Sequence, residues 1–248
     1  MSLARTAWSL VVSKAKQPRC LRGHMNKLPV VYDHSAKAWF TVRIFKNWFF
    51  NNFVSQVIRY QTQVLKVNRD QVRALLLLDN APAHPPSSEL VADHGHIHVK
   101  FLPANTILLI QHMDQGIIVA FKHLYRTRFL EDMIVMIDAE EKNVGQLTLD
   151  NLKKYNRMSV VHNIAKAWGD ISISTLASGW NTLLHGTDPV VYFEGFEADN
   201  FYCRLHETGE QVKPDDVQDW LDCDEGDPGM QVLTEQEIAE TVLHSNGS

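Results

Sequence analysis

The stretch RALLLLDN, residues 73–80, decides the fold of this 248-residue chain. Four consecutive leucines stand between an arginine and the turn signal Asp79-Asn80. A short apolar run bounded in this way predicts a strand that is buried on both faces, as in a parallel or mixed sheet covered by helices. The stretch therefore predicts an α/β protein.

Periodicity on both sides of this strand predicts its neighbours. Thr41 opens a helical pattern whose apolar residues recur every three or four positions, namely Ile44, Phe45, Trp48, Phe49, Phe53, Val57 and Ile58. Short β-rich runs lie at 10–12 and 28–32, and alternation over 96–101 predicts a half-buried strand. Helices are expected over 87–91, 116–138, 148–155, 159–168 and 174–184, the last two opened by a serine cap.

Charge is distributed unevenly along the chain. Residues 1–128 carry 17 basic and 6 acidic side chains, whereas residues 188–248 carry 2 and 16, within a net charge of −5. The basic residues that acids do not balance locally are Lys14, Lys16, Arg19, Arg22, Lys27, Arg43, Lys46, Arg59, Lys66, Arg69 and Arg73. Such a surplus suits phosphate backbones. The alternative is that the acidic tail folds back and neutralises the basic half.

The apolar runs and the cysteines of the sequence indicate the cellular compartment in which we expect the protein. No apolar run reaches the roughly 20 residues of a spanning helix, so we expect a soluble protein without a membrane segment. Three cysteines, Cys20, Cys203 and Cys223, are odd in number and far apart, which indicates a reducing compartment such as the cytosol or nucleus. Two amphipathic helices, expected over 215–223 and 234–243, give the acidic tail a surface for a protein partner.

Two aspartates occupy positions that favour chemistry. Asp79 directly follows the predicted buried strand, and Asp114 precedes the long helix. In α/β folds, ligand-binding and catalytic sites lie at the ends of strands. The polar residues around the two aspartates are Asn80, His84, Asn105, Gln111 and Gln115. Carboxylates bind Mg²⁺ or Mn²⁺, and two such ions can cleave a phosphodiester. The alternative for an aspartate at a strand end is a turn former or cap.

Several strings carry a resemblance to a known family. LLLLDNAPAHP (75–85), VKFLPANT (99–106), QHMDQGII (111–118) and FKHLYR (121–126) resemble the catalytic domain of Tigger/pogo-type transposases of the DDE superfamily, which includes jerky-like proteins. The later strings NIAKAW, SGWNTLL and DWLDCDEGDPGMQVLTEQEI resemble the tails of Tigger- and jerky-like members. The resemblance covers residues from about 15 to 243.

The resemblance implies a fold and a site. It implies a truncated ribonuclease-H-like mixed sheet flanked by helices over residues 1–140, a helical extension over 141–187 and an acidic tail with two short helices over 188–248. Three acids bind Mg²⁺ or Mn²⁺ in the family, and Asp79 and Asp114 match the second and third. No residue matches the first acid, because Asp33 lies in a loop that corresponds to no catalytic position.

The resulting hypothesis is a transposase-derived nuclear protein that binds DNA through Lys14, Lys16, Arg19 and Arg22 without cleaving it. One alternative keeps a metal-dependent endonuclease whose first acid comes from Asp33 or from another chain. A second alternative is an interaction remnant that acts through the acidic tail.

Overall fold

The computed structural model describes residues 9–103, 116–138, 152–186, 213 and 215. The chain divides into two compact units, residues 1–104 with 156–169 and residues 105–155 with 170–248. The described elements combine strands and helices, which confirms the α/β class. The two helices expected over 215–223 and 234–243 lie outside the described residues, apart from residue 215.

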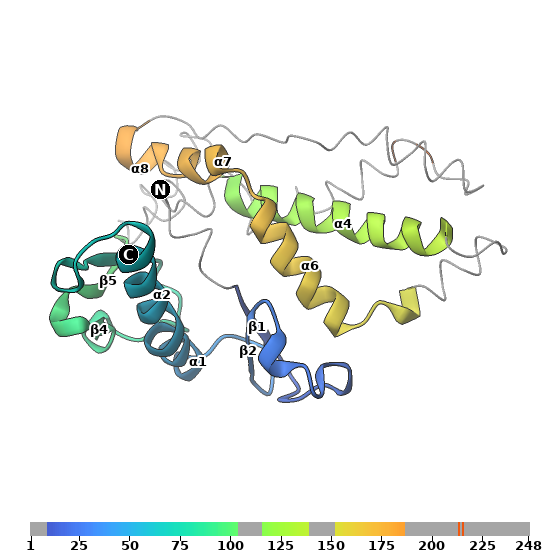
Figure 1. Ribbon diagram of the computed structural model, residues 1–248, viewed down its shortest axis with the longest axis horizontal. Coiled ribbons are helices and arrows are strands. Elements are labelled where there is room, and N and C mark those ends of the chain that lie inside the picture. The colour runs from blue at the N-terminus through green and yellow to red at the C-terminus, as the bar shows by residue number, and fades with distance from the viewer. Residues whose placement is uncertain (1–8, 104–115, 139–151, 187–212, 214, 216–248) are drawn as a thin grey trace, which may run out of the picture. The chain divides into compact units, whose positions relative to one another are not determined.

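The first unit contains a three-stranded sheet (Figure 1). It contains β3 (Ala74–Leu78), β4 (Val91–Ala92) and β5 (Ile97–Phe101) in the order β3-β5-β4. β3 and β5 run parallel, whereas β4 is antiparallel to β5. The sheet is therefore mixed, as expected. The helix expected over 87–91 is wrong, because only Ser87–Glu89 form a 3-10 turn and Val91 already belongs to β4.

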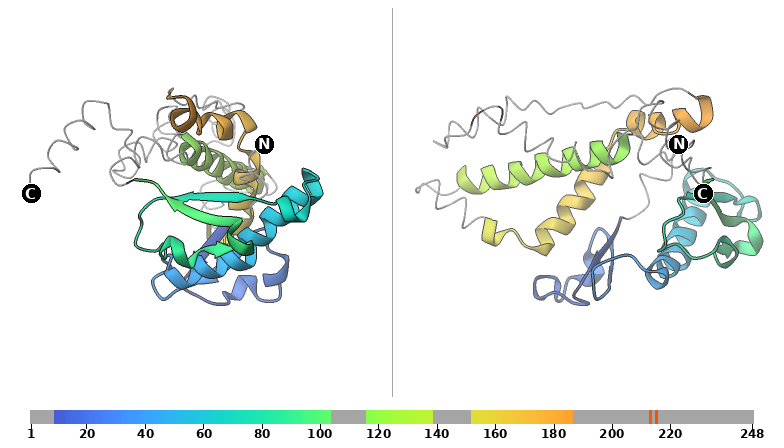
Figure 2. Two further views of the ribbon diagram at one scale, coloured as in Figure 1. Left: turned by 90° about the vertical axis from the view of Figure 1, so that its left-hand side faces the viewer. Right: turned by 180° about the vertical axis from the view of Figure 1, so that it is seen from behind.

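One long helical segment packs on this sheet. It consists of α1 (Val42–Trp48), a π turn (Phe49–Phe53), α2 (Val54–Arg59) and a second π turn (Tyr60–Val64). It begins where expected, because the side-chain oxygen of Thr41 accepts a hydrogen bond from the Ile44 N–H at 3.3 Å. Figure 2, left, shows the segment lying along one face of the strands.

The π turn explains how this helix keeps one apolar face. The buried residues Phe45, Phe49, Phe53 and Val57 are spaced by four, and such a row drifts by about 40° per step around an α-helix of 3.6 residues per turn. A π turn contains extra residues, so it cancels part of the drift and keeps Phe53 and Val57 above the sheet.

The expectation that the leucine strand is buried on both faces is wrong. Ala74, Leu76 and Leu78 pack against the helical segment, but the side chain of Leu75 on the opposite face is 50% exposed. β5 shows the same difference and confirms the predicted alternation, since Ile97 and Val99 are buried while His98 and Lys100 are exposed. In the described part of this unit, a single layer covers the sheet.

A second, two-stranded sheet lies in the same unit. β1 (Leu10–Ser13) and β2 (Val31–His34) run parallel and are joined by 3-10 turns at Arg19–Leu21 and Met25–Lys27. Of the β-rich run expected at 28–32, only the part from Val31 onward forms a strand. Leu28 and Val30 instead are buried in a core with Leu21 and Val161. Val161 belongs to α6 (Arg157–Asp170), which begins before the predicted Ser159.

The second unit is helical in its described residues. α4 (Ile118–Asp138) confirms the predicted long helix. The helix expected over 174–184 is instead two, α7 (Ile173–Ser178) and α8 (Asn181–His185), separated at Gly179. The cap of α7 is Ser172, whose oxygen accepts the Thr175 N–H at 3.0 Å. None of the helices in the described ranges is both long and apolar enough to cross a membrane.

Candidate functional site

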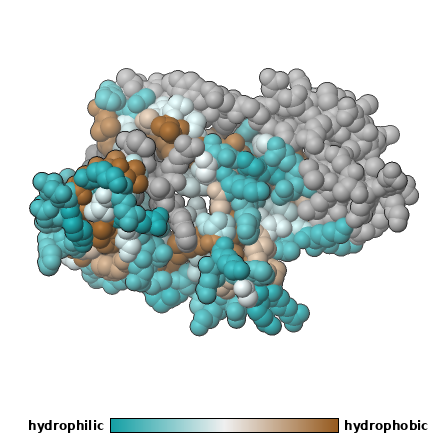
Figure 3. All heavy atoms as spheres, viewed as in Figure 1, coloured by the Kyte–Doolittle hydropathy of each residue, from teal (hydrophilic) through white to brown (hydrophobic). Residues whose placement is uncertain are grey.

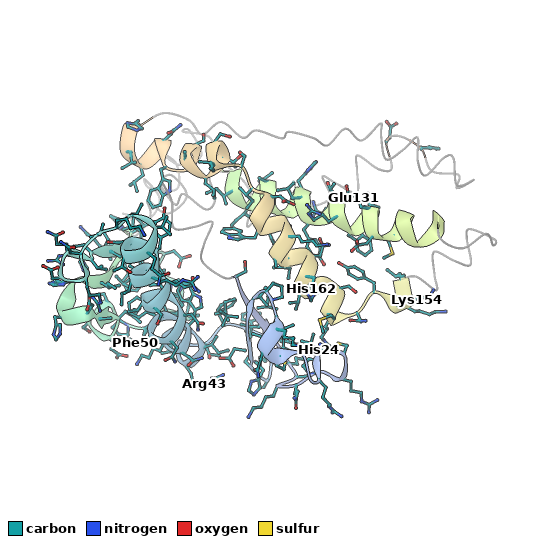
Figure 4. The ribbon with its side chains drawn as sticks, in the orientation of Figure 1. His24, Arg43, Phe50, Glu131, Lys154 and His162 are labelled. Carbon is teal, nitrogen blue, oxygen red and sulfur yellow. The ribbon has the colours of Figure 1, made fainter. Side chains whose placement is uncertain are left out.

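A basic loop connects β1 to β2. We use this name for residues 14–27, in which Lys14, Lys16, Arg19, Arg22 and Lys27 are all exposed. Among the described residues, none of these five side chains has a carboxylate within 4.0 Å. Figure 4 shows long side chains with terminal nitrogens extending outward around His24, and Figure 3 shows a largely hydrophilic surface there.

The fold holds the basic loop on a fixed scaffold. Leu21 is fully buried, and its N–H donates to the Pro18 oxygen at 3.0 Å. The Tyr32 hydroxyl of β2 donates to the Ala15 oxygen at 2.8 Å and ties the loop to the sheet. Gly23 has a φ of +81°, a conformation that glycine adopts without steric cost. The cations therefore project from a packed support.

Three other basic residues of the first half, Arg43, Lys46 and Arg69, are paired with carboxylates, contrary to the expectation from the sequence. Arg43 contacts Asp33, Lys46 forms an ion pair with Glu89, and the Arg69 guanidinium binds both oxygens of Asp93 at 2.7 and 2.8 Å. The hydrogen bond from Arg69 is the largest influence on Asp93 and lowers the pKa of its carboxyl group. Within the described residues, the basic loop thus keeps five cations without a carboxylate partner, and Arg59, Lys66 and Arg73 likewise have none within 4.0 Å.

Asp79 stands at the end of β3 and closes a turn. Its Oδ1 accepts the Ala81 N–H at 3.1 Å and lies 3.0 Å from His84 Nδ1, which is also 3.0 Å from the Asp79 backbone oxygen. The neighbouring Asn80 amide donates to the Leu102 oxygen at 3.1 Å. The structure therefore brings together three of the seven predicted site residues, Asp79, Asn80 and His84. Asn105, Gln111, Asp114 and Gln115 lie outside the described residues.

The His84 ring connects this turn to the core. Its centroid lies 4.6 Å from that of Phe45 in the helical layer and 6.3 Å from that of Phe101 in β5. The imidazole thus packs between the sheet and its covering helix while one nitrogen faces Asp79. This arrangement fixes the Asp79 carboxylate at the sheet end, where it serves as a turn former.

The described residues alone do not fit a Mg²⁺ or Mn²⁺ site. Such ions prefer several oxygen ligands. Within the described ranges, no three His, Cys, Asp or Glu side chains gather in a way that could hold a metal. Asp79 offers one carboxylate, and its other near neighbour is the His84 nitrogen.

Asp33, the alternative first acid, is held in a different network. It accepts the His34 N–H at 2.7 Å and the Arg43 guanidinium at 3.2 and 3.4 Å; Figure 4 labels Arg43 on α1. Partial burial raises the pKa of Asp33, but the hydrogen bonds from His34 and Arg43 outweigh burial and lower the pKa overall. Asp33 does not join Asp79 and His84 in a common metal-binding group.

Comparison with known proteins assigns the family. The chain belongs to the DDE superfamily endonucleases, which match residues 4–180, and the predicted resemblance is thereby confirmed. It is 38% identical over 242 residues to Tigger transposable element-derived protein 7 of Homo sapiens, covering 96% of this chain and 44% of that protein.

Jerky proteins are more distant relatives. The Jerky protein homolog of Homo sapiens and the Jerky protein of Mus musculus are each 30% identical over 174 residues, covering 70% of this chain and 28% of those proteins. The chain therefore spans less than half the length of these curated relatives. No solved structure matches it.

Proposed function

We propose that this chain is a nuclear DNA-binding protein of the DDE family that does not cleave DNA. The observation that carries the proposal is the basic loop, in which Lys14, Lys16, Arg19 and Arg22 project from a packed scaffold without a nearby carboxylate in the described part of the chain. Unpaired cations on a fixed support attract phosphate groups and release the counterions bound to them.

The binding we propose is to the DNA backbone. Contacts to phosphates position a protein on the duplex but carry no base information. The basic loop consists of 3-10 turns and irregular segments rather than a helix that could enter the major groove. We therefore infer little sequence preference in this interaction.

The finer architecture belongs to the same proposal. We propose a ribonuclease-H-like sheet within residues 1–140, a helical extension over 141–187 and an acidic tail over 188–248 that contacts a protein partner. Within this scheme, Asp79 and Asp114 are remnants of a three-acid Mg²⁺ or Mn²⁺ site. The engagement of Asp33 by Arg43 supports the absence of a substitute first acid.

A salt titration tests DNA binding. Each phosphate contact contributes about 0.9 to the slope of log affinity against log salt. Replacing Lys14, Lys16, Arg19 and Arg22 with glutamine should reduce that slope by up to about 3.6 on duplex DNA. The matched control carries Arg43→Gln, Lys46→Gln and Arg69→Gln, since these cations already meet carboxylates and their loss should change the slope much less.

The two sets of variants can contradict the proposal directly. If the basic-loop variant keeps the slope of the parent chain, or if the control lowers the slope as much, the basic loop is not the DNA contact. Circular dichroism spectra of all three proteins establish that the comparison is made on folded chains.

A nicking assay tests the second part of the proposal. Supercoiled plasmid incubated with the chain and Mg²⁺ or Mn²⁺ should stay supercoiled. The matched variant is Asp79→Asn, because an amide oxygen can still accept the Ala81 N–H while the charge is lost. Cleavage by the parent chain that disappears in Asp79→Asn would overturn the inactive assignment.

A further inference from the structure

The turn that connects β2 to α1, residues 35–41, carries a tryptophan in solvent. Trp39 is 75% exposed, and the adjoining Phe40 is 47% exposed. Tryptophans stand at 39, 48, 168 and 180 in the described ranges, and only Trp39 among these four is exposed. Trp48, in contrast, packs with its ring centroid 5.6 Å from that of Phe45 and 5.4 Å from that of Phe53. Trp39 belongs to neither of the two apolar clusters of the described residues.

Local hydrogen bonds hold Trp39 in this position. The Ser35 hydroxyl donates to the Trp39 oxygen at 2.7 Å, and the Ala38 N–H donates to the Ser35 oxygen at 3.0 Å. Ala38 has a φ of +58°, in the left-handed region that residues with a side chain seldom adopt. The turn thus folds back on Ser35 immediately before Thr41 caps α1. The position of Trp39 is therefore set by its sequence neighbours rather than by distant segments.

The same turn lies beside the beginning of the basic loop. The Ser35 N–H donates to the Ser13 oxygen at 3.0 Å, and Lys14 follows Ser13 directly. Ser35 is therefore hydrogen-bonded both to Trp39 and to the residue before Lys14. The hydrogen bond from the Tyr32 hydroxyl to the Ala15 oxygen fixes the next residue of the basic loop. Because β1 and β2 run parallel and in register, the tryptophan and the first cations of the basic loop lie at the same end of this sheet.

The charges around this turn suit a chain of phosphates. Lys37 is exposed and, like Lys14 and Lys16, has no carboxylate within 4.0 Å in the described part of the chain. Asp33, an acid at this end of β2, is offset by Arg43 at 3.2 Å. Proteins bind single-stranded nucleic acid with such a combination, because an aromatic ring stacks on a base while nearby cations attract the phosphates.

We propose that Trp39 stacks on an unpaired base of single-stranded DNA while Lys14, Lys16 and Lys37 bind the adjoining phosphates. This site rests on the proposed binding of the DNA backbone by the basic loop and adds a class of ligand to it. In an uninterrupted duplex each base is already stacked on its neighbours, and extracting one base costs free energy. Trp39 therefore favours single strands over duplex. Every base has a flat aromatic face, so we expect little preference for base identity.

The first test measures the affinity of the full chain for labelled oligothymidylate by fluorescence anisotropy. Trp39→Ala should weaken binding about fivefold to a hundredfold, which is the loss expected for one stacked base. Trp39→Tyr should keep most of the affinity because it retains an aromatic ring. The matched control is Phe50→Ala, which removes another exposed aromatic side chain, on the helical segment, and should leave the affinity unchanged.

The second test separates stacking from charge. Stacking releases no counterions, so Trp39→Ala should keep the slope of log affinity against log salt of the parent chain. Lys37→Gln should reduce that slope by about 0.7 on the single strand, as expected for one lost phosphate contact. On an uninterrupted duplex, Trp39→Ala should bind like the parent chain.

A third measurement observes the ring itself. Oligothymidylate should quench part of the tryptophan emission of the parent chain, because a stacked base quenches an indole. Trp39→Tyr should show a smaller loss of emission at saturation, although it still binds. Equal quenching in the two proteins would place the base away from Trp39.

Four further results would overturn the proposal. Trp39→Ala could bind oligothymidylate as tightly as the parent chain, it could lose affinity equally for single strand and duplex, or Phe50→Ala could lose as much. Sedimentation without DNA could also reveal a dimer that Trp39→Ala abolishes, which would assign Trp39 to self-association. The proposed function fails separately, since it requires the basic-loop variant to lower the salt slope whether or not Trp39 stacks.

Discussion

The phenylalanine pair in the π turn permits a sharp test of the core. Phe49 is fully buried and stacks on Phe53 with ring centroids 5.6 Å apart. Its sequence neighbour Phe50 meets it edge-on at 5.0 Å but is 41% exposed. Truncating a buried phenylalanine to alanine costs about 3–5 kcal/mol, so Phe49→Ala should destabilise the first unit by this amount. Phe50→Ala removes the same atoms from a half-open position and should cost below about 1 kcal/mol.

Hydrogen exchange of the β5 amides reports the stability of this unit directly. Because each 1.4 kcal/mol corresponds to about a factor of ten, Phe49→Ala should lower protection at Ile97–Phe101 by about a hundredfold to several thousandfold. Phe50→Ala should lower it by less than about tenfold. Equal losses in the two variants would refute the assignment of Phe49 to the core and Phe50 to the surface, and so would a loss below tenfold for Phe49→Ala.

Two further predictions concern the entry to α1. Thr41→Ala should cost about 1 kcal/mol in urea unfolding, because it removes the oxygen that caps the Ile44 N–H, and Thr41→Ser should restore most of it. Arg43→Ala should raise the pKa of Asp33, measured by NMR titration of the carboxyl group. Since the folded-state pKa is lowered, this carboxylate stabilises the fold above its unfolded pKa, about 3.9, and the stabilisation is lost as the pH falls through the folded value. Arg43→Ala should therefore lose less stability on acidification than the parent chain.

The helical layer could be predicted well from the sequence because its pattern is local. Thr41 and the apolar residues after it announce a capped amphipathic helix, and the structure places that helix within a residue of the expected start. The π turns were not predicted. The signal was present in the exact four-residue spacing from Phe45 to Val57, which a uniform α-helix cannot keep on one face.

Charge pairing could not be predicted because it depends on contacts between distant segments. Lys46 meets Glu89, and Arg69 meets Asp93, on elements that the intervening β3 separates in sequence. Counting acids near each base therefore overstated the free positive charge at Arg43, Lys46 and Arg69. In the basic loop the expected surplus of positive charge is found, because the fold brings no described acid to it.

The leucine strand shows that a sequence can predict a strand correctly while its burial is predicted wrongly. Its apolar residues on both faces predicted two covering layers, yet the described unit supplies one layer and a single strand partner. Packing against one layer explains why Ala74, Leu76 and Leu78 are apolar, but it does not explain why Leu75 and Leu77 are. The apolar run therefore predicts that a strand forms but does not fix how many layers cover it, because Leu75 is 50% exposed while Leu76 and Leu78 pack against the core.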